Sequence, residues 1–252
     1  MSNRFTNQVA VVTGGSTGIG YAIAHALLAE GARRVYITGR SERSLAQAAA
    51  GLGKGAVAVR SDVAKVTDLD QLRAVVEGHG DRVDMVFANA GIATNNVLGD
   101  TDENDYLRMF DVNVKGVFFT VQTLLPLLND GGCVVLTSSI VNSKGMENLS
   151  LYSATKCAVR SFARSWANDL KGRKIRVNAI SPGFTETPIL KNGLRINDQQ
   201  VANLKKYAAD MVPAGYMAQP EEIAAAALYL ASSDARYVNG IDLAVDGGYA
   251  QV

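Results

Sequence analysis

Residues 9–20 read VAVVTGGSTGIG, and this stretch decides the fold. Its first part, Val9 to Thr13, is a short β-branched run that is typical of a buried strand. Gly14, Gly18 and Gly20 follow in the turn, and a helical pattern begins at Ile19 and continues to Glu30. The sequence therefore predicts a strand, a glycine-rich turn and a helix in immediate succession.

The same alternation of short apolar runs and longer helical stretches continues to the end of the chain. Most of the runs are apolar throughout, as in strands that are covered on both faces, and the intervening helices supply the crossovers that parallel strands require. We therefore predict an α/β fold, a doubly wound parallel seven-stranded sheet flanked by helices, which is the Rossmann fold. After Val9 to Thr13, the predicted strands are Val35 to Thr38, Ala56 to Arg60, Met85 to Ala88, Cys133 to Thr137, Ile175 to Ile180 and Ile241 to Val245.

No linker or charge block divides the chain, so residues 1–252 are predicted to form one domain for dinucleotide binding and catalysis. The one irregular stretch, residues 188–213, is expected to form a substrate lid. Hydrophobic residues make up 48% and the formal net charge is +1, which argues against a nucleic-acid partner. Because no leader or membrane-spanning run is visible, we expect a cytoplasmic protein without membrane contact. Cys133 and Cys157 have no metal-site spacing and are predicted to be reduced core residues, and no metal is expected.

The glycine-rich turn suits a diphosphate. Glycine lets the main chain approach the phosphates closely, and the helix N-terminus offers unpaired N–H groups. The spacing T-G-x-x-x-G-x-G differs from the common G-x-G-x-x-G pattern, and a tight turn without ligand is the alternative.

The second predicted strand ends in Thr38-Gly39-Arg40, where the adenosine ribose of a dinucleotide would lie. No carboxylate is present to accept from a ribose 2′-hydroxyl, whereas Arg40 could bind a 2′-phosphate. NADP(H) is therefore favoured and NAD(H) remains possible. In the alternative, Arg40 is a solvated cation or stacks on the adenine.

Tyr152 and Lys156 are four residues apart in a predicted helix and hence on one face. A neighbouring ammonium favours the phenolate, and lowering the phenol pKa by ~3 units requires ~4 kcal/mol. The alternative is a surface tyrosine packed on a lysine stem. Ser138 and Ser139 end the strand CVVLTSS at the ligand-binding edge of such sheets, and Asn113 is an amide within the apolar FDVNVKGVFF, either catalytic or simply buried.

Taken together, TGGSTGIG, Asp62-Val63, ANAG at 88–91, Asn113, Ser139, YSATK and PGFTET at 182–187 resemble the short-chain dehydrogenase/reductase family over nearly the whole chain. The resemblance implies that Tyr152 is the acid/base, Ser139 orients the substrate oxygen, Lys156 binds the nicotinamide ribose and lowers the Tyr152 pKa, and Asn113 holds a relay water. It also implies a homotetramer that packs the helices of residues 102–128 and 151–171. The cofactor-binding set that the glycine turn and the resemblance imply is Gly14, Ser16, Thr17, Gly18, Ile19, Gly20, Gly39, Arg40, Asp62, Val63, Asn89, Ala90, Gly91, Tyr152, Lys156, Pro182, Gly183, Thr185 and Thr187.

The expected reaction is hydride transfer between NADP(H) and a ketone or secondary alcohol, as in a carbonyl reductase or alcohol dehydrogenase. The small-molecule substrate is expected to contact Val141, Met146, Leu149, Phe184 and the 188–213 segment. Two alternatives use the same scaffold, a lyase or dehalogenase without hydride transfer and a non-catalytic dinucleotide sensor. The intact glycine turn argues against the first, and the presence of Tyr152 and Lys156 argues against the second.

Overall fold

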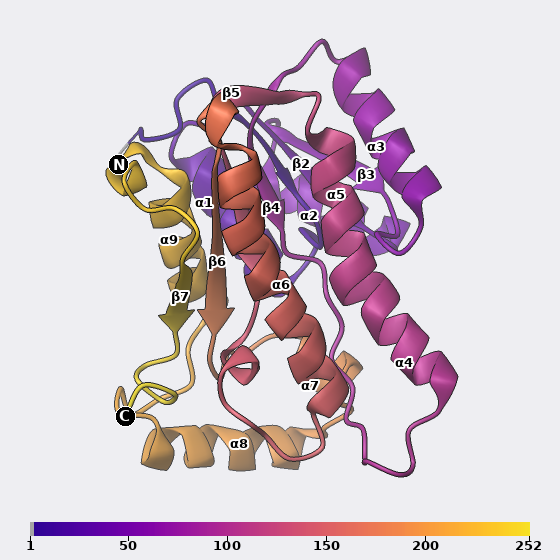
Figure 1. Ribbon diagram of the computed structural model, residues 1–252, viewed down its shortest axis with the longest axis vertical. Helices are drawn as coiled ribbons and strands as arrows, with labels where there is room; N and C mark the ends of the chain where they lie inside the picture. The colour runs from indigo at the N-terminus through magenta and orange to yellow at the C-terminus, as the bar shows by residue number, and fades with distance from the viewer. Residues whose placement is uncertain (1–2) are drawn as a thin grey trace.

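A computed structural model of the chain describes residues 3–252. The predicted fold class is confirmed, because all seven strands pair in parallel in the order β3-β2-β1-β4-β5-β6-β7 (Figure 1). The strands are β1 (Val9–Val12), β2 (Arg34–Gly39), β3 (Ala56–Arg60), β4 (Val83–Ala88), β5 (Leu128–Thr137), β6 (Arg176–Pro182) and β7 (Asp242–Val245).

Helices cover both faces of the sheet. They are α1 (Gly18–Ala29), α2 (Glu42–Leu52), α3 (Val66–Gly78), α4 (Glu103–Phe110), α5 (Gly116–Leu124), α6 (Ser150–Asp169), α7 (Ile189–Asn192), α8 (Asp198–Met211) and α9 (Pro220–Ala231). A π-helical turn, Asp111–Lys115, joins α4 to α5, and Ile140–Asn142 forms a 3-10 turn after β5. Helices α1, α2 and α9 pack on one face of the sheet, and α3, α5 and α6 pack on the other.

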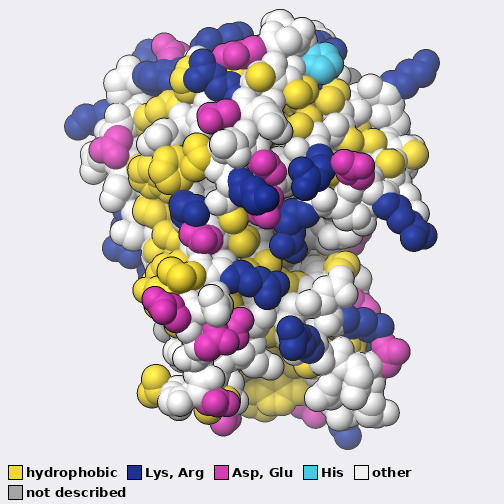
Figure 2. All heavy atoms as spheres, turned by 90° about the vertical axis from the view of Figure 1, so that its right-hand side faces the viewer, with side chains coloured by type: hydrophobic (Ala, Val, Ile, Leu, Met, Phe, Trp, Pro, Cys, Tyr) yellow, Lys and Arg dark blue, Asp and Glu magenta, His cyan; other side chains and the backbone are white. Residues whose placement is uncertain are grey.

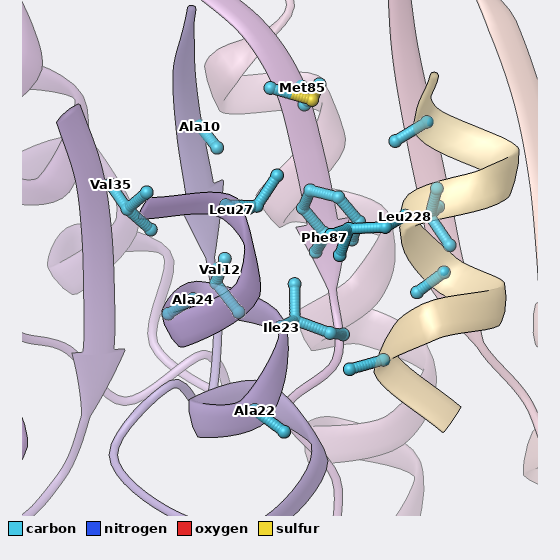
Figure 3. Close-up of a cluster of buried hydrophobic side chains, with 14 of the residues drawn as sticks. Ala10, Val12, Ala22, Ile23, Ala24, Leu27, Val35, Met85, Phe87 and Leu228 are labelled. Carbon is cyan, nitrogen blue, oxygen red and sulfur yellow. The ribbon is translucent and has the colours of Figure 1, made fainter. Parts of the chain in front are cut away.

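The five inner strands, β1, β2, β4, β5 and β6, each contribute to two hydrophobic cores because successive side chains point to opposite faces. In β1, Ala10 and Val12 pack with α1 and α9, whereas Val9 and Val11 pack with α3, α5 and α6. Figure 3 shows the first of these cores, in which Phe87 of β4 lies between Leu27 of α1 and Leu228 of α9. This double burial is the reason that the strand sequences are apolar throughout rather than alternating.

The strand order reverses between β1 and β4, so the loops that follow these two strands diverge and leave a crevice at the carboxyl edge of the sheet. The glycine-rich turn follows β1, and residues 89–91 follow β4. Helix α8 lies across this edge, below the ends of β6 and β7 in Figure 1. The topology therefore brings the predicted binding segments to one edge.

The 188–213 segment is more regular than its sequence indicates. It forms α7 and the 14-residue helix α8, which begins with a reciprocal capping box between Asn197 and Gln200. Each of these side chains accepts from the other residue's backbone N–H, at 2.9 and 2.8 Å, which satisfies two groups that a helix start would otherwise leave unpaired.

The two cysteines differ in burial. Cys133 of β5 is buried as predicted, and burial raises its pKa to about 11. The prediction for Cys157 is wrong, because this residue is exposed on α6, whose buried side is formed by Thr155, Lys156 and Val159. Within residues 3–252, no helix combines the length and the hydropathy needed to cross a membrane. The same residues contain no cluster of three or more His, Cys, Asp or Glu side chains that could hold a metal ion.

Candidate active site

One cavity of about 950 Å³ runs along the carboxyl edge of the sheet. It is lined by Ser139, Tyr152 and Lys156 and by every residue of the predicted cofactor set except Gly20. Like Gly20, Asn113 does not line the cavity, because it is fully buried behind the cavity wall. The sequence-predicted residues are therefore brought together from eight different segments, and two of these residues, Gly20 and Asn113, lie behind the cavity wall.

The glycine-rich turn is close-packed against the loop after β4. Gly14 has φ +66°, and a Cβ there would come within 3.0 Å of the Ala90 Cα. Gly20 is excluded from the cavity because it packs against Gly14 and lies where a Cβ would be 2.6 Å from the Asn89 amide nitrogen. Thr17, the N-cap of α1, makes no side-chain capping bond. The first N–H groups of α1 are thus available to an anionic ligand at the cavity.

Two buried hydroxyls belong to residues that line the cavity where β2 and β3 end. Thr38 Oγ1 and Ser61 Oγ both lie in its wall, and neither has a hydrogen-bond partner among the described residues. A buried hydroxyl without a partner is costly, so these two groups fit a polar ligand at this position. Neither residue was in the predicted cofactor set. Each of them directly precedes a residue of that set, because Thr38 comes before Gly39 and Ser61 comes before Asp62. Both fit the adenosine part of a dinucleotide.

Asn89 connects the ends of three strands. Its amide nitrogen donates to Thr13 O at 3.1 Å, and its amide oxygen accepts from the Thr137 hydroxyl at 3.2 Å. The Thr13 hydroxyl accepts in turn from the backbone N–H groups of Asn89 and Ala90 at 3.0 and 3.1 Å. The Asn89 side chain therefore stabilises the junction of β1, β4 and β5, while its backbone remains at the cavity wall.

Tyr152 and Lys156 lie on the cavity side of α6. The Lys156 ammonium is 5.5 Å from the centroid of the Tyr152 ring and donates to Thr137 O at 2.8 Å. Lys156 is almost fully buried, and burial lowers its pKa to about 8. A Cβ at Gly91 would lie 3.5 Å from the Lys156 Nζ, and both residues line the cavity, so the lysine borders it beside Gly91.

The pKa of Tyr152 differs from the sequence expectation. Burial raises it to about 12, and a hydrogen bond with the Ser139 side chain opposes this only in part. The ammonium of Lys156 does not offset burial, because it is directed at the Thr137 carbonyl and is itself desolvated. In the folded chain by itself, the phenol is therefore held in its protonated form.

The two neighbouring serines have separate partners. The Ser138 hydroxyl donates to Lys156 O at 3.0 Å and accepts from the Asn142 amide at 2.8 Å, so it fixes α6 against the end of β5. Ser139 is the serine that reaches the Tyr152 hydroxyl. This arrangement supports Ser139, rather than Ser138, as the group that would share the substrate oxygen with Tyr152.

Asn113 is fully buried in the π-helical turn between α4 and α5. Its amide oxygen accepts from Ile92 N at 2.8 Å, and its amide nitrogen donates to Ile92 O at 2.8 Å and to Thr155 Oγ1 at 3.1 Å. π-helical turns often occur at functional sites because they redirect a side chain. Here the turn aims Asn113 at the loop after β4 and at α6, next to Gly91.

Residues 14–250 match the family model described as enoyl-(acyl carrier protein) reductase. The chain is 40% identical to the oxidoreductase asL5 of Sarocladium schorii, over 99% of this chain and 98% of that protein. It is 34% identical to the short chain dehydrogenase/reductase AacuN of Aspergillus aculeatus, over 96% of both. The chain belongs to the short-chain dehydrogenase/reductase family.

Two other similarities concern the cofactor. An NADP-dependent (R)-specific alcohol dehydrogenase of Lentilactobacillus kefiri is 34% identical over 99% of both chains. The crystal structure of 3-ketoacyl-(acyl-carrier-protein) reductase from Brucella melitensis complexed with NADH superposes with a TM-score of 0.88, at 30% identity over 98% of this chain and 99% of that one. As a short-chain dehydrogenase/reductase, the chain is an NAD(P)-dependent oxidoreductase that acts on CH–OH and C=O groups.

Proposed function

We propose that the chain reduces a ketone, or oxidises the corresponding secondary alcohol, with NADP(H) as the preferred cofactor. The observation that carries this proposal is the Tyr152 phenol at the cavity, hydrogen-bonded to Ser139 and four residues before the buried Lys156. A lyase or dehalogenase would not need the intact glycine turn and the open α1 N-terminus, which support hydride chemistry with a bound dinucleotide.

The roles of the side chains follow from their protonation. When bound, the nicotinamide supplies or accepts the hydride. Tyr152, protonated at neutral pH, donates its phenol proton to the oxygen of the substrate carbonyl, and Ser139 donates a second hydrogen bond to the same oxygen. Lys156 holds its charge beside the phenol, and the Thr137 carbonyl fixes the direction of its ammonium group. Asn113 positions the loop that carries Gly91 and, through Thr155, the first turns of α6.

The preference for NADP(H) is supported by the start of α2. Arg40 is exposed at the cavity, and the next residue, Ser41, caps α2 by accepting from Ser44 N at 3.2 Å. A guanidinium beside a helix N-terminus favours a phosphate group through charge and hydrogen bonding together. Gly39 adds no side chain between this position and the hydroxyl of Ser16. A ribose 2′-phosphate is the group that this corner of the cavity fits.

The test of the cofactor is kcat/KM with NADPH and with NADH for the wild type and for Arg40→Ala. We expect the wild type to prefer NADPH and the variant to lose about tenfold with NADPH alone, the scale of one charged hydrogen bond. Arg43→Ala is the matched control, because Arg43 is an exposed arginine in the first turn of α2 that does not line the cavity. A tenfold preference of the wild type for NADH would reject the role of Arg40.

The test of the reaction is a panel of ketones and secondary alcohols followed by absorbance at 340 nm. Turnover by the wild type but not by Tyr152→Phe supports the proposal. Tight binding of a dinucleotide without turnover of any substrate would instead favour a sensor.

We also propose a homotetramer, assembled through α4–α5 and α6. Phe118 of α5 meets Phe162 and Trp166 of α6, and the rings of Phe162 and Trp166 stack at 4.7 Å while remaining partly exposed. Figure 2, which faces the side of the molecule at the right of Figure 1, shows hydrophobic side chains gathered along one margin of the surface. Light scattering of the wild type and of Trp166→Arg tests this, and a monomeric wild type would contradict it.

A further inference from the structure

The 188–213 segment lines the cavity with uncharged side chains, and the lysine and arginines of the lining, Arg40, Arg108 and Lys156, come from other segments. The lining residues of this segment, from Pro188 to Tyr207, are all neutral. The segment does contain charged side chains, but they lie elsewhere: Lys191 pairs with Asp198, and Lys205 pairs with Glu186 at 2.6 Å. A carboxylate or phosphate on the substrate would therefore meet no opposite charge from this segment.

The same part of the cavity has an aromatic side. Phe184 and Tyr207 both line the cavity, with ring centroids 5.8 Å apart and the rings nearly perpendicular. Phe184 also packs edge-on against Tyr249, at 4.8 Å. Met146 and Leu149 line the cavity as well, and they pack in the same apolar cluster as Tyr152 and Phe184. Aromatic edges and faces of this kind bind planar rings well.

Tyr207 is held in place by the C-terminal tail. Its hydroxyl oxygen lies 3.0 Å from that of Tyr249, which is buried. The tail is in turn fixed by Asp246, which accepts from Gly248 N at 2.9 Å and from Ala250 N at 2.8 Å. The position of Tyr207 over the cavity is thus set by Tyr249, which lies 42 positions away in the sequence.

The direction of the hydrogen bond between the two tyrosines follows from Lys144. Its ammonium lies 4.4 Å from the centroid of the Tyr249 ring and donates to Tyr249 O at 3.3 Å. A cation over the ring withdraws electron density and makes the Tyr249 phenol the better donor. The Tyr207 oxygen therefore accepts, and the Tyr207 proton remains free to be donated into the cavity.

We propose that Tyr207, oriented by Tyr249, is a substrate-binding residue, and that the preferred substrates are uncharged aryl ketones with a hydrogen-bond acceptor on the ring. In this arrangement the aryl ring of the substrate packs against Phe184 and Tyr207, and the ketone oxygen lies at Tyr152 and Ser139. The Tyr207 hydroxyl donates to the hydrogen-bond acceptor on the substrate ring. This inference rests on the proposed ketone reductase function and narrows its substrate class.

The experiment measures kcat/KM for cyclohexanone, 1-tetralone, 6-hydroxy-1-tetralone, 7-hydroxy-1-tetralone and acetoacetate, with the preferred reduced cofactor. The enzymes are the wild type, Tyr207→Phe, Tyr249→Phe and the control Tyr216→Phe. Tyr216 is a surface tyrosine outside the cavity whose hydroxyl donates to Glu222 at 2.5 Å. The substitution at Tyr207 keeps the ring and removes only the hydroxyl, so packing on Phe184 is preserved.

We expect the wild type to prefer at least one hydroxytetralone over cyclohexanone and over the charged acetoacetate. Tyr207→Phe should lose about tenfold on that hydroxytetralone and less than about twofold on 1-tetralone, because only the former uses the hydroxyl. Tyr249→Phe should show the same selectivity with a loss of about threefold, and Tyr216→Phe should match the wild type.

Two outcomes overturn the inference while leaving the reductase function intact. They are a preference of the wild type for cyclohexanone or acetoacetate, and an equal effect of Tyr207→Phe on 1-tetralone and on the hydroxytetralones. If no ketone in this set or in the wider panel is reduced with either cofactor, the proposed function itself fails and the inference fails with it.

Discussion

Lys156 is expected to reduce the stability of the fold that contains it, and Lys156→Met tests this. Its ammonium is buried, and its pKa falls from 10.5 to about 8 because the folded protein desolvates the charge. That difference corresponds to a penalty of about 3 kcal/mol on the charged folded state at neutral pH. Methionine has a similar length and no charge, so the substitution removes this penalty.

The Lys156→Met substitution also removes one hydrogen bond. The Lys156 ammonium donates to Thr137 O at 2.8 Å, and a buried carbonyl that loses a partner costs about 1–2 kcal/mol. The net expectation is a variant about 1–2 kcal/mol more stable than the wild type at pH 7. For a chain of this length that raises Tm by about 2–8 °C. The same variant should lose nearly all activity, which calorimetry and steady-state kinetics on one preparation would show together.

The pH dependence provides a second check. The folded pKa of Lys156 lies below its unfolded value, so the penalty is complete below about pH 8 and fades as pH rises toward 10.5. The advantage of Lys156→Met should shrink over this range. Lys115→Met is the control, because Lys115 pairs with Asp111 in a half-exposed position and should change stability by less than about 0.5 kcal/mol. A Lys156→Met variant that is less stable than the wild type at pH 7 would refute the reasoning.

Three further substitutions test other parts of the site and fold. Tyr152→Phe should lower kcat/KM by at least ~10² while a fluorescence titration still shows cofactor binding; near-normal activity would contradict the acid/base role. Asn96→Ala should cost about 1 kcal/mol in urea unfolding and lower kcat, because Asn96 caps α6 by accepting from Leu151 N at 3.1 Å; Asn96→Asp keeps the acceptor and should recover most of the loss. Burial alone would raise the pKa of Asp81, but hydrogen bonds from Tyr36 and two arginines lower it, so Asp81→Asn should cost about 2 kcal/mol at pH 7. That cost should fade as pH drops below the usual aspartate range, and a difference independent of pH would exclude the charge as its origin.

The sheet could be predicted because a strand that is buried on both faces has apolar residues at successive positions. β5 shows the limit of that signal. Its predicted start is Cys133, but the strand begins at Leu128, where polar residues and two glycines precede the apolar run. Val83 pairs with Leu128 across a register shift, and no pattern in either segment indicates this contact. Helix α8 was also hard to predict from its own sequence, because it packs against Tyr249 and Ala250, which lie in the distant C-terminal tail.

The site was predictable to the extent that its residues follow strand ends or share a helix face. Tyr152, Ser139 and Lys156 meet for those reasons. The direction of Asn113 was not predictable, since a π-helical turn depends on the elements that pack around it. Nor could the sequence indicate the pKa of Tyr152, because spacing gives the distance to Lys156 but not the desolvation of both groups.

The desolvation of Tyr152 bears on the direction of the reaction. A phenol with a pKa of about 12 is protonated at pH 7, which is the form that donates a proton to a ketone oxygen. Oxidation of an alcohol begins from the phenolate, and forming it at pH 7 from that pKa costs about 7 kcal/mol. Lys156, with a pKa of about 8, still carries its charge at pH 7 but loses it as pH rises. At neutral pH the folded chain by itself therefore holds Tyr152 in the form that donates a proton to a ketone oxygen, and alkaline conditions would remove the Lys156 charge beside the phenol.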